Sequence, residues 1–576
     1  MKKLLIPVIL VFMVACEPSP TSNGLDSILE EVRNKEFLTE EEREQFPLGR
    51  YTEADFEARA DFAAEMIEKL NALDVSSMEL TDQISVELMT YRLKEDITKY
   101  EYKSYLNPIM IDAGFHMSFA GRPKRYRFSK EEDYTDYIRD LKAFPDYAQQ
   151  HIDLMRKGLD LGIALPKEIL GGYEVTYDTH LEGSTEESSF YAPFLKFPAS
   201  FSDAQKAQLT QDGKAAVEQG ALAGYRLVKD FFDNEYFPNA PDQIGARHWP
   251  RGEEYYQVRA NHFSTLDMTV KEIHDLGLSE VERIKAEMEE AKNKAGFQGS
   301  RKEFIQFLRT DPQFYPKTPR ELLSFAAYLS KKADGRLPAL FSRLPRQPYT
   351  VEPVAPHLAP KYTGGRYSGA PLKSTRAGEY WVNTYDLPSR PLYVMPSLTL
   401  HEAVPGHHLQ SALTKELEHL PRFRNNMYIS AFGEGWGLYS EYLGIEMGMY
   451  ETPYEDFGRL TYEMWRACRL VVDTGIHSYG WTRQQVIDYL AEHTALSIHE
   501  CTTETDRYIA WPAQALSYKI GELKIKELRK KAEADLGEDF DVREFHNALL
   551  SEGTLTLPLL EKVIDHYIQE KKSGDS

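Results

Sequence analysis

The chain has 576 residues and a formal net charge of −22, from 90 acidic and 68 basic side chains. This acidic excess disfavours nucleic acid as a partner, because a phosphate-binding surface needs clustered Lys and Arg. After about residue 25, no Gly/Ser-rich or Pro-rich linker and no internal repeat divides the sequence. We expect one large body with two lobes, residues 26–260 and 261–576.

The amino terminus has the pattern of a bacterial lipoprotein signal. A charged start is followed by an apolar stretch from Leu4 to Val14, then by Ala15-Cys16 and a polar segment. We predict a signal peptide over residues 1–15, lipid on Cys16 and a tether over residues 16–25. The alternative is an ordinary secretory peptide with an incidental cysteine. This alternative stays open because Met13 occupies a position where Leu is commoner in lipoprotein signals.

No later segment has the apolar length of a membrane-spanning helix. The mature protein is therefore expected in the cell envelope, on the periplasmic or outer-membrane face, and held to the membrane only by its lipid. Cys468 and Cys501 are too few for a disulfide scaffold, although one bridge between them is possible in an oxidising compartment.

Helical signals dominate the rest of the chain and predict a mainly α fold. Amphipathic periodicity runs through residues 51–73, 84–100 and 276–295. Capping-box spacing marks four helix starts, at Thr39, Thr269, Thr318 and Thr482. Between residues 349 and 397 the pattern changes, and residues 380–385 and 392–394 are β-prone, which indicates a small sheet or hairpin.

The most informative segment is His401-Glu402-Ala403-Val404-Pro405-Gly406-His407-His408. It resembles the His-Glu-x-x-His helix of zinc hydrolases, in which two histidines share a metal and the Glu acts on water. On an ideal helix His407 points about 120° away from His401, whereas His408 is aligned but about 10 Å distant. Pro405 and Gly406 allow the helix to bulge and return one of these histidines to the metal.

A third metal ligand is expected from the downstream helix that contains Glu434 and Glu441. Glu434 completes a set of two His and one Glu, which leaves a fourth zinc position open for water. Glu441, two turns further on, can accept a hydrogen bond from a ligand histidine or can be a solvated surface residue.

These motifs resemble the domain-of-unknown-function 885 family, largely bacterial lipoproteins, which is grouped by similarity with the gluzincin metallopeptidases. The family pattern is matched by the segments His401–His407, Glu434-Gly435-Trp436, Asp473-Thr474-Gly475-Ile476-His477, Asp506-Arg507-Tyr508 and Pro512-Ala513-Gln514. Ala513 stands where the family usually has glycine. This difference affects the expected turn at this position but not the expected site. The resemblance favours His407 over His408 as the ligand. It also implies a helical cleft fold with a short β element along the substrate groove.

Three further residues are candidates for the cleft. His477, before a helix start, can donate to a developing oxyanion or can be an ordinary hydrogen-bonded histidine. Tyr518 resembles the gluzincin tyrosines that support the tetrahedral intermediate, and its alternative is a packed core tyrosine. Arg507 can bind a substrate carboxylate or form salt bridges with the acids that flank it.

The function predicted from these residues is zinc-dependent peptide hydrolysis with one zinc ion, a peptide substrate and Glu402 as general base. One alternative is a non-catalytic lipoprotein that binds a peptide or a metal. Glu402 argues against it, because this residue is not a ligand and has no binding task. A zinc hydrolase acting on a non-peptide amide is the other alternative.

Overall fold

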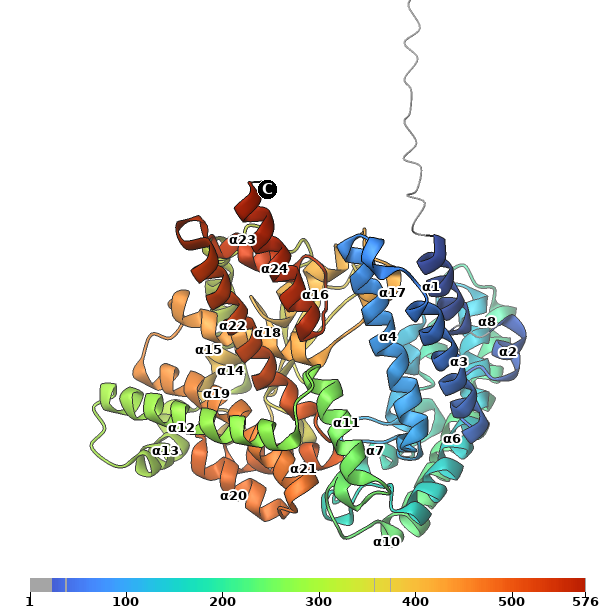
Figure 1. The fold of residues 1–576 in the computed structure, drawn as a ribbon. Coiled ribbons are helices and arrows are strands. Elements are labelled where there is room, and N and C mark those ends of the chain that lie inside the picture. The colour runs from blue at the N-terminus through green and yellow to red at the C-terminus, as the bar shows by residue number, and fades with distance from the viewer. Residues whose placement is uncertain (1–22, 37–38, 357, 373, 575–576) are drawn as a thin grey trace, which may run out of the picture.

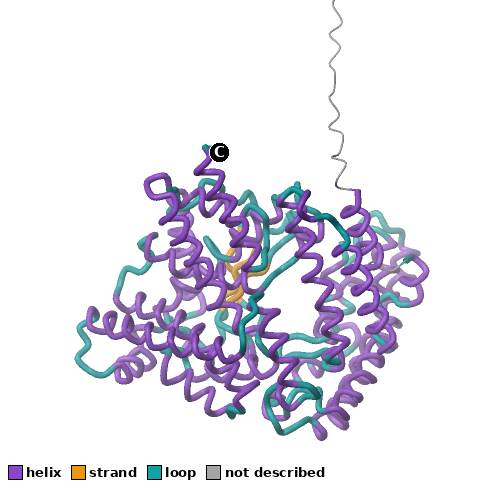
Figure 2. Tube along the Cα trace, viewed as in Figure 1, coloured by secondary structure: helices purple, strands orange, loops and turns teal. Residues whose placement is uncertain are grey.

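The computed structural model describes residues 23–36, 39–356, 358–372 and 374–574, and these residues fold mainly into α-helices (Figures 1 and 2). This confirms the predicted fold class. The predicted signal peptide and Cys16 lie outside the described residues. Helix α1 begins at Asn23, within the last residues of the predicted tether.

The amino-terminal half, blue to green in Figure 1, is a stack of helices. The longer ones are α1 (Asn23–Glu36), α3 (Glu53–Asn71), α4 (Leu80–Glu101), α6 (Glu131–Leu161), α8 (Asp203–Ala216), α9 (Leu222–Phe231) and α11 (Gly252–Ser264). The shorter ones are α2 (Glu40–Gln45), α5 (Phe115–Ala120), α7 (Val175–Asp178) and α10 (Phe237–Asn239). The predicted lobe boundary after residue 260 falls inside α11.

The carboxyl-terminal half contains the remaining α-helices. They are α12 (Val270–Lys294), α13 (Arg301–Thr310), α14 (Pro319–Asp334), α15 (Met395–Glu402), α16 (His407–Lys415), α17 (Arg422–Asn426), α18 (Ser430–Glu446), α19 (Pro453–Thr474), α20 (Arg483–His493), α21 (Ile498–Ala510), α22 (Ser517–Leu536), α23 (Val542–Leu550) and α24 (Leu557–Ser573). Thr39, Thr269, Thr318 and Thr482 cap helices as predicted.

A three-stranded sheet lies at the centre of the view in Figure 2. It is formed by β1 (Tyr349–Pro353), β2 (Gly365–Ser368) and β3 (Gly378–Val382), in the order β1-β3-β2. β1 is parallel to β3, and β2 is antiparallel to it, so β2 is an edge strand. The sheet confirms the predicted β element. The β-prone run 392–394 is instead one turn of 3₁₀ helix, directly before α15.

One large apolar core continues through both halves of the chain. Within it α12 packs along α19, α18 packs along α22, and α15 packs on α18. Cys468 and Cys501 are buried and free, so they do not form the bridge that the sequence allowed. Within the described part of the chain, no helix has the length and apolar character needed to cross a bilayer.

Candidate metal centre

The chain leaves the helix completely between His401 and His407, rather than bulging as predicted. Helix α15 ends at Glu402, and α16 begins at His407. Gly406 is required at this break, because a Cβ there would lie 1.9 Å from the carbonyl oxygen of His401. The indole Nε1 of Trp436 donates a hydrogen bond to the carbonyl of Pro405 and so fixes the connection to α18.

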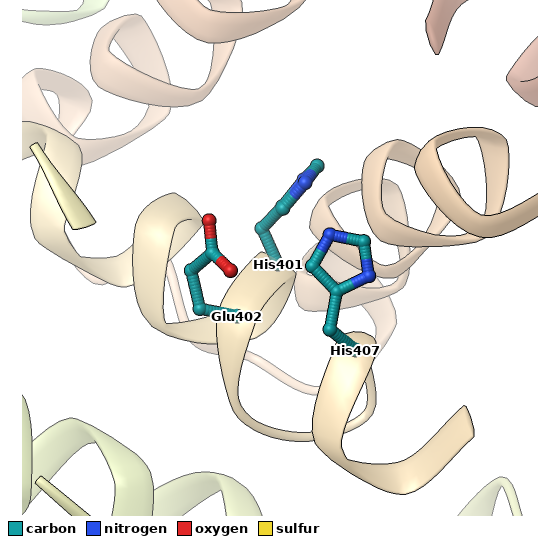
Figure 3. A group of neighbouring side chains, drawn as sticks. All are labelled: His401, Glu402 and His407. Carbon is teal, nitrogen blue, oxygen red and sulfur yellow. The ribbon is translucent and has the colours of Figure 1, made fainter. Parts of the chain in front are cut away.

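His401, Glu402 and His407 extend from these two helix ends toward the same space (Figure 3). Each offers one ligand atom, and these atoms lie within 4.8 Å of one another. Glu434 reaches the same point from α18: its Oε2 lies 3.3 Å from Nε2 of His401 and 3.4 Å from Nε2 of His407.

These separations fit a zinc ion. A tetrahedral zinc with ligand bonds of about 2.0–2.1 Å holds any two ligand atoms about 3.3–3.4 Å apart. Glu434 Oε2 keeps this distance from both imidazole nitrogens. Two imidazoles and one carboxylate are also a donor set that zinc prefers at catalytic sites. The residues present therefore fit the metal that the sequence predicts.

Glu441 orients His401. Nδ1 of His401 lies 2.8 Å from Oε1 of Glu441, which is buried and also pairs with Arg466 at 3.3 Å. A proton held on Nδ1 by this carboxylate leaves Nε2 free to bind a metal. Gly437 makes room for the imidazole, because a Cβ at this position would lie 2.6 Å from Cε1 of His401.

The electrostatics of the centre favour a cation. Burial by itself lowers the pKa of His401, but hydrogen bonds to Glu434 and Glu441 outweigh it and raise the pKa to about 9. Burial likewise raises the pKa of Glu434, yet the neighbouring His407 and His401 bring it well below its usual range. Three carboxylates, including Glu402, thus surround two histidines in a largely buried site, and positive charge stabilises them.

Glu402 is held by the edge strand β2. Its Oε2 accepts a hydrogen bond of 2.7 Å from the backbone N–H of Tyr367, while Oε1 has no hydrogen-bond partner among the described residues. Glu402 lines a cavity of about 760 Å³, together with His401, His407 and Glu434. This volume is in the range of small-molecule and peptide sites. One carboxylate oxygen is therefore available to a ligand beside the metal centre.

Tyr428 is a neighbour of the centre that the sequence did not reveal. Its hydroxyl donates to Oε1 of Glu434 at 2.9 Å, while the residue as a whole is 57% exposed at the cavity wall. The alternating glycines of α18 are the sequence feature that indicates close neighbours on this face of the helix. A Cβ at Gly433 would lie 2.4 Å from the ring of Tyr428, just as one at Gly437 would meet His401.

His408 faces away from the centre. Its Nδ1 lies 3.1 Å from the hydroxyl of Tyr367, and its ring packs on Tyr349. Burial lowers the pKa of His408 to about 4. The geometry therefore places His407, not His408, beside His401 and Glu434.

His477 is not a residue of the cavity wall, which corrects its predicted role as an oxyanion donor. It is fully buried, and its Nδ1 accepts a hydrogen bond from the backbone N–H of Ala246. Its Nε2 donates to the carbonyl of Tyr508. Both ring nitrogens are thus used to join distant segments, and burial lowers the pKa of His477 to about 4.

The rest of that motif also has a structural role. Asp473 accepts hydrogen bonds from the hydroxyl of Tyr256 and from the backbone N–H of Ala513. Ala513 has a φ of +70°, in the left-handed region that favours glycine. The next residue, Gln514, accepts a hydrogen bond from Nη1 of Arg507. The motif therefore shapes the turn that positions Arg507.

Tyr518 and Arg507 both line the cavity. The ring centroid of Tyr518 lies 6.3 Å from that of His401, and its hydroxyl has no hydrogen-bond partner among the described residues. Arg507 forms an ion pair with Glu504 at 2.8 Å. Both readings of Arg507 thus have support, since it combines a salt bridge with a place at the cavity wall.

Fold and site together define a mainly helical protein with a buried histidine–glutamate centre at the wall of a large cavity. The chain belongs to the DUF885 family, described as "Bacterial protein of unknown function (DUF885)". The model of this family matches residues 41–564. The further likeness to gluzincin peptidases stays a prediction.

Two solved structures are similar to this chain. The crystal structure of a "putative lipoprotein" from Colwellia psychrerythraea is 27% identical and covers 96% of this chain and 100% of its own, with a TM-score of 0.84. A "putative lipoprotein of unknown function" from Shewanella oneidensis is 17% identical, covers 94% and 98%, and has a TM-score of 0.70. At this identity the second shows the shared fold alone. No curated protein matches the chain.

Proposed function

We propose that this protein is a zinc-dependent peptidase whose metal ligands are His401, His407 and Glu434. The observation that carries the proposal is the position of Glu434 Oε2, which lies 3.3 Å from one imidazole nitrogen and 3.4 Å from the other. Glu402 stands beside these ligands with one free carboxylate oxygen in the cavity. A structural zinc site needs no such neighbour, whereas a hydrolytic site needs a base.

A zinc ion held by His401, His407 and Glu434 would lower the pKa of a bound water molecule and polarise a carbonyl oxygen. Glu402, whose Oε1 is free among the described residues, would be the general base that takes up a proton at this oxygen and returns it to the leaving amine. The hydrogen bond from the N–H of Tyr367 keeps the other carboxylate oxygen in place during both transfers. Tyr518, whose hydroxyl is uncommitted, donates to the oxyanion.

We propose that the substrate is a peptide lying along β2. This strand is the edge of the sheet and lines the cavity through Gly365, Arg366 and Tyr367. The backbone of an edge strand can pair with an extended peptide. The carbonyl to be cleaved then lies between Glu402 and the metal ligands.

A lipid anchor at Cys16 places this activity in the cell envelope. The pattern around Cys16 supports this proposal, as does the lipoprotein description of the similar structure from Colwellia psychrerythraea. Labelling of cells with a lipid precursor should mark the natural protein but not a Cys16→Ala variant. Equal labelling of the two proteins would refute attachment at Cys16.

The activity is tested by digesting a peptide library with and without a chelator, with the products read by mass spectrometry. Cleavage that stops with the chelator and returns with added zinc supports the proposal. A protein that binds zinc but cleaves no peptide would contradict it and would favour the alternatives, a binding protein or a hydrolase of another amide.

A further inference from the structure

The wall of the cavity is much less acidic than the chain as a whole. Acidic residues outnumber basic ones by 90 to 68 in the sequence, but the cavity is lined by five Lys or Arg and only four Glu. The basic residues are Arg366, Lys415, Arg466, Arg469 and Arg507. Since a divalent cation at the metal centre adds further positive charge, the cavity favours an anionic ligand.

Two of these arginines share a single counter-ion. Nη2 of Arg469 donates to Oε2 of Glu504 at 2.9 Å, and Nη2 of Arg507 donates to the same oxygen at 2.8 Å. The pKa of Glu504 is lowered to about 2, because the two guanidinium groups outweigh the effect of burial. One carboxylate therefore neutralises two guanidinium groups, and one positive charge remains.

Both guanidinium groups keep unused donors. A guanidinium has five N–H groups. Those of Arg469 reach only Tyr508 and Glu504, and its Nη1 has no hydrogen-bond partner in the described part of the chain. Arg507 uses three N–H groups, toward Glu504 and Gln514. Buried donors without acceptors cost free energy, so an anion bound here is stabilised.

Glu500 does not supply the missing acceptor. It is buried at the same wall, but no hydrogen bond joins its carboxylate to a guanidinium group among the described residues. Burial also raises the pKa of Glu500, which weakens it as a counter-ion. The excess positive charge beside Glu504 thus stays available to a ligand.

The arginine pair lies close to the metal centre. The guanidinium of Arg469 stacks between Trp465, at 4.2 Å, and Tyr518, at 4.0 Å from the ring centroids. The ring of Tyr518 lies in turn 6.3 Å from that of His401. Arg469 is therefore within about 10 Å of a metal ligand, a span that about three extended residues cover.

We propose that Arg469 and Arg507 bind a carboxylate of the peptide substrate, so that the scissile bond lies within about three residues of that carboxylate. The distance to the scissile bond rests on the proposed function of the metal centre. The carboxylate itself can be the carboxyl terminus or an acidic side chain, and the test distinguishes them. A carboxyl terminus would make the protein an exopeptidase that removes short carboxyl-terminal pieces.

Binding is measured calorimetrically with the Glu402→Gln variant, once with zinc and once with chelator. The probes are acetyl-tetra-alanine with a free carboxyl terminus, its carboxamide, and the amide of acetyl-Ala-Ala-Asp-Ala. Charge-assisted hydrogen bonds predict that the free acid binds about tenfold or more tightly than the carboxamide, also with chelator present. The chelator arm excludes binding of the carboxylate to the metal itself.

The Arg507→Gln variant should reduce this preference to about threefold or less, since the charge is lost. An Arg483→Gln variant is the control, because Arg483 pairs with Asp506 and is not among the residues lining the cavity. If the Asp-containing amide binds tightly while the free acid binds no better than the carboxamide, the carboxylate recognised belongs to a side chain; tight binding of both means that the subsite accepts either carboxylate. Should an Arg507 variant fail to fold, the three probes still test carboxylate recognition in the protein that retains Arg507.

Equal binding of all three probes to the chelated protein would overturn the proposal. Zinc binding and library cleavage would then still stand, so the proposed peptidase function would survive. Selective binding of the free acid by a protein that takes up no zinc even when zinc is supplied would have the opposite meaning: the subsite would be retained and the peptidase refuted.

Discussion

Nδ1 of His401 lies 2.8 Å from Oε1 of Glu441, a carboxylate that is almost fully buried two turns beyond the proposed ligand Glu434. Partners of this kind fix the tautomer of a ligand histidine, and their loss typically weakens metal binding about 10- to 100-fold. We expect Glu441→Gln to lower the zinc affinity about tenfold and Glu441→Ala to lower it more. Competition with a fluorescent chelator measures both affinities.

Glu446 is the matched control for Glu441. It lies on the same helix and pairs with Arg529 at 2.7 Å rather than with a residue of the centre. Glu446→Gln should leave the zinc affinity unchanged. If both substitutions weaken zinc binding equally, Glu441 acts through the stability of α18 and not through His401.

The neighbouring histidines His407 and His408 should differ in their effect on zinc. His407→Ala should abolish binding, as should His401→Ala and Glu434→Ala, because each removes one of the three proposed ligands. His408→Gln should retain about one zinc per chain, since His408 contacts Tyr367 and Tyr349 instead. Elemental analysis of the purified variants gives the zinc content.

The fold should survive these substitutions, because a chain of this size does not need a metal to complete its core. Circular dichroism checks this point. Zinc retained in His407→Ala but lost in His408→Gln would show that the break at Gly406 presents the other histidine.

Ala513 should be replaceable by glycine with a gain in stability. Its φ of +70° strains an alanine, whereas glycine adopts this conformation freely. Ala513→Gly is expected to raise the free energy of unfolding by up to about 1 kcal/mol. Ala515→Gly is the control, because this equally buried alanine has helical geometry and its replacement should lower stability by about 1 kcal/mol. Urea denaturation measures both values, and a loss of stability in Ala513→Gly would contradict the prediction.

Most of the fold could be predicted because helix signals are local. The caps at Thr269 and Thr482 and the apolar periodicity of residues 51–73 are properties of single segments. The run 392–394 shows the limit, since a short β-prone segment became a 3₁₀ turn when the following helix began at Met395. Tertiary packing decided its conformation.

The centre was predictable where chemistry and spacing coincide in the chain. His401, Glu402 and Glu434 are recognisable because zinc hydrolysis requires those residue types on neighbouring helices. The residues that only the fold brings to the centre carried no such signal: Tyr367 acts through its backbone, and Tyr428 comes from a loop. His477 was predicted to be at the site but lies away from the cavity wall. Its sequence context does not reveal that both ring nitrogens bind backbone groups.

The most direct test of the account is the Glu402→Gln variant, assayed for zinc and for turnover in the same preparation. Glutamine keeps the size of the side chain and an acceptor for the N–H of Tyr367, but it cannot take a proton from water. Zinc content should stay at about one per chain, while peptide cleavage falls about 10²- to 10⁴-fold, as is typical when a general base is lost. A variant that cleaves peptides as fast as the natural protein would contradict the assignment of Glu402 and, with it, the proposed mechanism.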